Sequence, residues 1–141
     1  MLVHLEGFLI RKSREVDGLT IMKNVYSAVL IANLLIESVG AFVLLATPGV
    51  LVDAENVSAV LWSSNYGFVA LAVGSVAFWA WPHRNSFAAA GVVLGVLFSF
   101  HLAISVALAL ADELFFDVLL HGGFAVLCLY LFVNRMRWCE D

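Results

Sequence analysis

The sequence predicts an all-α integral membrane protein, an up-down bundle of four helices with both termini in the cytoplasm. Composition is the first observation behind this prediction: 63% of the 141 residues are hydrophobic, 13% are charged, and the mean hydropathy is +1.00. A soluble domain of average composition carries about 25% charged residues. The spacing of the apolar stretches and the placement of the basic residues are the other two observations.

Four apolar stretches are long enough to cross a bilayer, because a hydrocarbon core of roughly 30 Å needs about 20 helical residues. We expect them at about residues 25–47, 60–81, 86–109 and 113–133. Their connections are short, so each helix runs antiparallel to the next. Pro82 ends the second stretch, and Asn85 or Ser86 is placed to cap the third.

The two ends of the chain are more polar. Residues 1–24 form the N-terminal segment. Within it, residues 1–12 carry apolar side chains at roughly helical spacing among charged ones, which favours a short helix in the inner headgroup region, and Gly18 permits a bend before the first stretch. Residues 134–141 form a short tail. We expect both segments to be cytoplasmic.

The basic residues determine the predicted topology. Every Lys and Arg precedes the first stretch, lies between the second and third, or follows the fourth. They are Arg11, Lys12, Arg14, Lys23, Arg84, Arg135 and Arg137. The other two connections carry only acids. They are Asp53, Glu55, Asp112 and Glu113. The positive-inside rule therefore predicts cytoplasmic termini in a bacterial inner membrane. Because acids and bases are segregated, we expect the lipid bilayer as a partner and no nucleic acid.

Polar side chains inside the apolar stretches form the candidate site. An Asp at the centre of a membrane helix costs about 2.5–3.5 kcal/mol on insertion scales, so each such residue needs an explanation. Three pairs are spaced four residues apart, which places the two members on one helix face. These pairs are Asn33 with Glu37, His101 with Ser105, and Asp117 with His121.

The depths of these residues agree. At 1.5 Å per residue, both histidines fall roughly 10–12 Å below the outer surface and Glu37 about 15 Å below it. Asp117 and Asn65 lie at about 6 Å on the same count. We therefore predict that all four helices contribute to one pocket in the outer half of the bundle.

Such a pocket favours acid–base chemistry. Apolar surroundings favour the neutral form of a carboxylic acid, so Glu37 is the candidate proton donor. His101 or His121 is the candidate base, and Asp117 is expected to orient the second imidazole. The candidate ligand contacts are Asn33, Asn65, Tyr66 and Ser105. We assign no residue to a metal site. Metal binding by Glu37, His101, Asp117 and His121 stays open as a variant of haem binding, although the sequence contains no local ligand motif.

Three functions remain open. The first is binding or acid–base conversion of a lipophilic molecule, such as a quinone, isoprenoid or sterol-like compound. An enzyme of this kind would be an isomerase, a cyclase or a quinone-linked oxidoreductase. The second is haem binding by His101 and His121 at matching depth. The third is a non-enzymatic accessory or scaffold subunit, in which the polar residues serve only packing.

Small residues indicate where helices approach each other closely. One set, in the second stretch, is Gly67, Ala70 and Gly74. The other, in the third stretch, is Gly91, Gly95 and Ser99. Packing inside the bundle is the expected use of both sets. The second set is also the candidate face for a homo- or hetero-oligomer.

Several of these features occur in one order along the chain. They are Pro48-Gly49 after the first stretch, Asn65-Tyr66-Gly67 opening the second, Pro82 before a basic turn, and His101 late in the third. From about Val25 to Phe132 this order resembles the small bacterial four-helix membrane proteins of the DoxX-like group. Those proteins are associated with quinone-linked redox chemistry or are uncharacterised, so the resemblance implies a four-helix fold and a lipophilic ligand. The chain departs from the pattern because no arginine lies near Asn65 and its polar N-terminus is longer.

Overall fold

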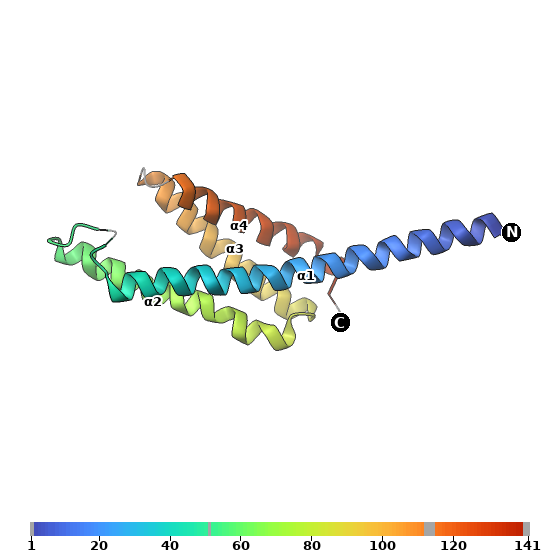
Figure 1. The fold of residues 1–141 in the computed structure, drawn as a ribbon, viewed down its shortest axis with the longest axis horizontal. Helices are drawn as coiled ribbons and strands as arrows, with labels where there is room; N and C mark the ends of the chain where they lie inside the picture. Colours follow the sequence, from blue (N-terminus) through green and yellow to red (C-terminus); the bar gives the residue numbers. More distant parts are fainter. Residues whose placement is uncertain (1, 51, 112–114, 140–141) are drawn as a thin grey trace. The chain divides into compact units, whose positions relative to one another are not determined.

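The computed structural model describes residues 2–50, 52–111 and 115–139, with side chains from Gly18 onward. The described residues are mostly helical and contain no strand (Figure 1). In order, the elements are α1 (Leu2–Ala46), α2 (Val57–Ala80), the 3₁₀ turn η1 (Trp81–His83), α3 (Phe87–Leu110), α4 (Phe115–Asn134) and the 3₁₀ turn η2 (Arg135–Arg137). The predicted all-α class is confirmed.

Among the described residues, four helical segments are long and apolar enough to cross a membrane. They are Gly18–Ala46, Val57–His83, Phe87–Leu110 and Phe115–Arg137. Large apolar side chains such as Phe42, Trp79 and Leu110 are exposed along them. Exposed apolar surface on this scale is typical of helices that meet lipid. Asp112 and Glu113, which the topology prediction uses, lie outside the described residues.

The first helix differs from the prediction. α1 continues from Leu2 to Ala46 without a break, so the expected bend near Gly18 is wrong. A single glycine costs a helix only about 1 kcal/mol relative to alanine, and adding a residue to an existing helix needs no new nucleus. Gly18 is therefore tolerated within one long helix.

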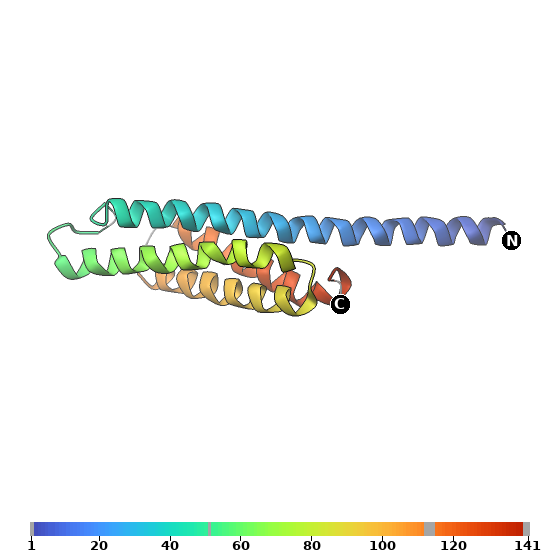
Figure 2. The ribbon, with the colours of Figure 1, turned by 90° about the horizontal axis from the view of Figure 1, so that it is seen from below.

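The chain forms two compact units. The first unit combines Met1–Ala28 with His83–Asp141, and within it α3 and α4 lie side by side and antiparallel (Figures 1 and 2). The second unit, Val29–Pro82, is a hairpin of the C-terminal part of α1 and α2. The Ser86 Oγ accepts a hydrogen bond from the Ala89 N–H at 3.4 Å, which confirms Ser86 as the cap of α3.

Small residues pack the hairpin unit. The buried face of α2 consists of Ser63, Gly67, Ala70, Gly74, Ala77 and Ala80. A Cβ atom at Gly67 would lie 3.0 Å from the Cγ of Leu45, and one at Gly74 would lie 3.1 Å from the Cβ of Glu37. The two helix backbones approach closely because these positions lack side chains. The predicted packing role of the small residues in α2 is confirmed.

The small residues of α3 do not form one packing face. Its buried residues are Ala90, Gly91, Leu94, Leu97 and His101. A Cβ at Gly95 would meet nothing within 4 Å, and Ser99 is exposed. Within this unit Gly95 and Ser99 do not pack against α4, because the larger residues Leu94, Leu97 and His101 occupy the buried face. Their expected packing elsewhere in the bundle stays a prediction.

Candidate functional site

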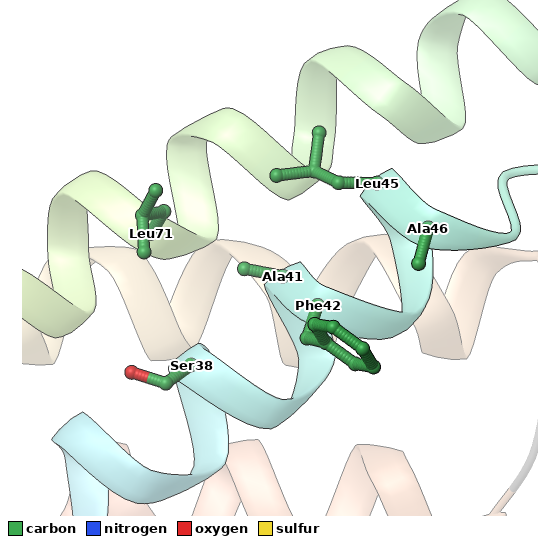
Figure 3. A pocket seen from close by; sticks show the side chains of 6 residues that line it. All are labelled: Ser38, Ala41, Phe42, Leu45, Ala46 and Leu71. Atoms are coloured by element: carbon green, nitrogen blue, oxygen red, sulfur yellow. The ribbon is translucent and has the colours of Figure 1, made fainter.

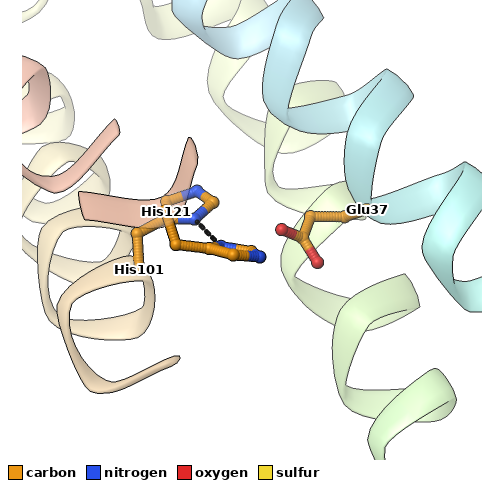
Figure 4. A group of neighbouring side chains, drawn as sticks. All are labelled: Glu37, His101 and His121. Atoms are coloured by element: carbon orange, nitrogen blue, oxygen red, sulfur yellow. Dashed lines mark hydrogen bonds between the residues drawn. The ribbon is translucent and has the colours of Figure 1, made fainter. Parts of the chain in front are cut away.

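Two histidines on neighbouring helices are in direct contact in the first unit. Nδ1 of His101 on α3 lies 2.9 Å from Nδ1 of His121 on α4, and the ring centroids are 5.1 Å apart (Figure 4). His101 is 1% exposed and His121 is half-buried. A neutral imidazole has one N–H and one lone-pair nitrogen, so one ring donates through Nδ1–H and the other accepts. The two rings hold one proton between their Nδ1 atoms.

Aromatic rings surround His101. The ring of Phe124 has its centroid 4.9 Å from that of His101, and the ring of Phe100 meets it edge-on at 5.3 Å. These contacts restrict rotation of the imidazole and limit the access of water to it. Phe124 is not among the site residues that the sequence predicts. Its position three residues after His121, on the same face of α4, is the signal that was available.

A second polar contact joins α3 and α4 one turn from the histidines. The Ser105 hydroxyl donates to the Val118 carbonyl at 2.9 Å. The next turn of α4 begins with Gly122, where a Cβ would lie only 3.1 Å from the Ser105 Oγ. The missing side chain at Gly122 lets the hydroxyl approach a carbonyl that already belongs to the helical ladder. Ser105 is a predicted ligand contact. Its hydroxyl proton takes part in the hydrogen bond that joins α3 to α4.

Asp117 lies in the first turn of α4, four residues before His121, and is half-buried. The described residues show no hydrogen bond between Asp117 and His121. His101, instead of the expected Asp117, is the partner of Nδ1 in His121. A carboxylate at this position is favoured by the positive end of the helix dipole.

The other predicted residues belong to the hairpin unit. Asn33 donates from Nδ2 to the Val73 carbonyl at 3.2 Å, which links α1 to α2. Glu37 lies one turn further along the same buried face of α1 and is 3% exposed; Figure 4 draws its side chain. Tyr66 is half-buried, whereas Asn65 is exposed because it lies opposite the buried Ser63 on α2. The predicted convergence of Glu37 with the histidines stays a prediction.

The hairpin unit also has an open groove of about 470 Å³ (Figure 3). Its lining residues are Ser38, Ala41, Phe42, Leu45, Ala46 and Leu71. This volume falls within the range of small-molecule sites, about 300–1,000 Å³. None of the predicted site residues lines the groove, and its lining has no acid or base. It therefore offers apolar contact and no proton transfer.

The contact between the histidines does not fit a haem. Two imidazoles that ligate one haem iron approach it from opposite faces of the porphyrin, whereas these rings meet directly through Nδ1. A haem between them would require α3 and α4 to separate. The same two imidazoles supply only two nitrogen ligands within this unit. Zinc sites have three or four protein ligands, so we assign no metal to the histidine pair.

Comparisons with protein-family models, curated proteins and solved structures find no match for this chain. The resemblance to the DoxX-like group stays an expectation from the sequence. The geometry of the described side chains is therefore the basis for any statement of function.

Proposed function

We propose that this chain is an integral membrane protein in which His101 and His121 exchange a proton with a bound lipophilic molecule. The ligand class is a quinone, an isoprenoid or a sterol-like compound. One observation carries the proposal: the two imidazoles share a hydrogen bond at 2.9 Å between helices of membrane-spanning length. Ionisable groups inside such helices are costly and are associated with function.

The shared hydrogen bond allows a proton to cross the pair. A proton added to Nε2 of the donor ring forms an imidazolium, which passes its Nδ1 proton to the acceptor ring. The acceptor ring then releases the proton from its own Nε2. One proton enters, one leaves, and the Nδ1–Nδ1 hydrogen bond is retained with its direction reversed. The pair thus accepts a proton at one point and delivers one at another, as acid–base catalysis requires.

The carboxylic acids have supporting roles in the proposal. Asp117 shares a face of α4 with His121, so its charge acts on the less buried ring of the pair. Glu37 is proposed as a further proton donor, because the sequence predicts that it lies at a depth close to that of the two histidines. The ligand is proposed to be lipophilic because the exposed helix surfaces are apolar, so that a molecule dissolved in the bilayer reaches them without crossing water.

Mass spectrometry of the molecules that co-purify with the chain tests this proposal. We expect the wild type to retain a lipophilic compound that both His101→Asn and His121→Asn lose, because each variant removes one of the two imidazoles that are proposed to contact the compound. His83→Gln, at an exposed histidine outside the pair, is the matched control and is expected to retain the compound. Equal amounts of the compound in all four proteins would exclude the site.

The proposed topology has a separate test. In a chain with Cys139→Ser, a new cysteine is placed between α1 and α2 by Ala54→Cys or before α3 by Asn85→Cys, both at exposed positions. A membrane-impermeant maleimide added to intact cells is expected to label the first variant only. Labelling of Asn85→Cys without permeabilisation would reverse the orientation.

A second candidate function is that of an accessory subunit. It is favoured by the open position at Gly95 and the exposed side chain of Ser99. Small residues on an unpacked face allow another membrane helix to approach closely. A disulfide-linked dimer of the Ser99→Cys variant, with no dimer for Val126→Cys at an exposed position on α4, would support this use.

A further inference from the structure

The η2 turn holds the side chain of Arg135 in a defined place. Its guanidinium carbon lies 4.5 Å from the ring centroid of Phe87 and 4.0 Å from that of Phe132. Nη1 donates to the Phe132 carbonyl at 2.7 Å. Gly91 provides the necessary space, because a Cβ there would lie 3.1 Å from Nε of Arg135. The arginine is therefore stacked on aromatic rings and only half-buried.

Three buried hydrogen-bond donors occur at this turn and beside it. Nε of Arg135, Nε1 of Trp138 and the hydroxyl of Tyr26 have no hydrogen-bond partner within the part of the chain that the structure describes. Trp138 and Tyr26 are 2% and 1% exposed, and their rings are 5.0 Å apart. Buried polar groups are normally paired, so unpaired groups call for a partner. All three can donate a hydrogen bond, and Arg135 is a cation, so the missing partner of its Nε is an acceptor with negative charge.

The position of the turn indicates the source of that acceptor. Arg137 ends the fourth membrane-length segment, so η2 lies at the level of the lipid headgroups if the chain is inserted as proposed. Arg137 on the same turn is exposed, so its charge is screened by solvent and it is not part of the proposed site. α3 begins at Phe87, beside the guanidinium, and a helix N-terminus favours a phosphate.

We propose that the η2 turn is a binding site for the headgroup of an anionic phospholipid, with its phosphate on the guanidinium of Arg135. The phosphate is placed on the guanidinium because Nε has no hydrogen-bond partner among the described residues, whereas Nη1 donates to the Phe132 carbonyl. A guanidinium can donate two parallel hydrogen bonds to phosphate, which a lysine ammonium cannot reproduce. The aromatic rings contact the apolar part of the same lipid. This inference depends on the proposed membrane insertion but not on the histidine pair.

Lipid retention by the full-length chain tests the inference. The protein is placed in bilayers with equal amounts of phosphatidylglycerol and phosphatidylcholine of the same acyl chains, then extracted, and its bound lipids are counted by native mass spectrometry. We expect at least a tenfold preference of the wild type for phosphatidylglycerol. Arg135→Gln should abolish the preference, and Arg135→Lys, which keeps the charge and tests for misfolding, should weaken it several-fold.

Arg137→Gln is the matched control, since it removes an equal charge from the exposed side of the same turn. It should leave most of the preference intact. Equal losses in Arg135→Gln and Arg137→Gln would overturn the inference, because they indicate general electrostatic attraction. Displacement of the lipid by inorganic phosphate would also overturn it, since the ligand would then be a free anion.

The C-terminal acids provide one further control. Glu140 and Asp141 lie outside the described residues, and in the sequence they bring two negative charges close to Arg135. Retention of phosphatidylglycerol by the intact chain supports the lipid site. A preference that arises only after Glu140→Gln and Asp141→Asn would overturn it. The topology test above separates failure of this site from failure of membrane insertion.

Discussion

The hairpin of α1 and α2 and the pair formed by α3 and α4 use polar residues in different ways. In the hairpin, Asn33 bonds a backbone carbonyl and small residues allow the helices to approach closely. Between α3 and α4, two titratable side chains bond each other. An amide bonded to a carbonyl only joins two helices, whereas two imidazoles that share a proton can also exchange it. The hydrogen-bond partner of a polar residue in a membrane-length helix therefore indicates whether the residue joins helices or can also exchange a proton.

Close packing in the hairpin predicts the largest effect. Gly74→Leu places a side chain where even a Cβ atom would lie 3.1 Å from Glu37, so we expect a loss of about 1–3 kcal/mol in the free energy of unfolding. Gly123→Leu on α4 is the matched control, because that position is exposed and open. Denaturation in mixed micelles measures both. Similar losses of stability in the two variants would mean that the helices of the hairpin are not more closely packed than the surroundings of Gly123 on α4.

The histidine pair predicts a smaller, non-additive effect. His101→Leu or His121→Leu leaves one imidazole without its partner, and we expect each to cost on the order of 1 kcal/mol. The double variant should cost less than the sum of the two, since no unpaired ring remains. The same unfolding measurement provides the double-mutant cycle. Strictly additive losses would contradict a direct bond between the rings.

The smallest predicted effect concerns Ser105. Gly122→Ala introduces a Cβ 3.1 Å from the Ser105 Oγ and should weaken the bond to the Val118 carbonyl, at a cost of about 0.5 kcal/mol. Gly123→Ala adds the same methyl group to open space and should be neutral or slightly stabilising, because alanine favours a helix. An equal response of these neighbouring positions would show that the hydroxyl does not link α3 to α4.

Hydropathy was enough to predict the four long helices, because length and apolar composition decide which segments can span a membrane. Helical periodicity also placed Asn33 and Glu37 on one buried face of α1. It did not reveal that α1 continues through Gly18, since a glycine permits a bend without requiring one.

The contacts across helices were harder to predict. Counting along the chain gives the depth of a residue but not the rotation of its helix, so the matched depths of His101 and His121 did not predict the direct bond. Packing of Leu94 and Leu97 sets that rotation for α3 and leaves Gly95 and Ser99 on the outside. The stacking of Arg135 on Phe87 depends on the η2 turn, for which the sequence has no clear signal.

Solid-state NMR of the chain with ¹⁵N-labelled histidine, in lipid bilayers, tests the shared proton most directly. We expect one protonated and one unprotonated Nδ1, with a correlation between them across the hydrogen bond. The correlation should disappear in His121→Asn and persist in His83→Gln. Rings that both carry their proton on Nε2 alone, with no correlation between the Nδ1 atoms, would contradict it.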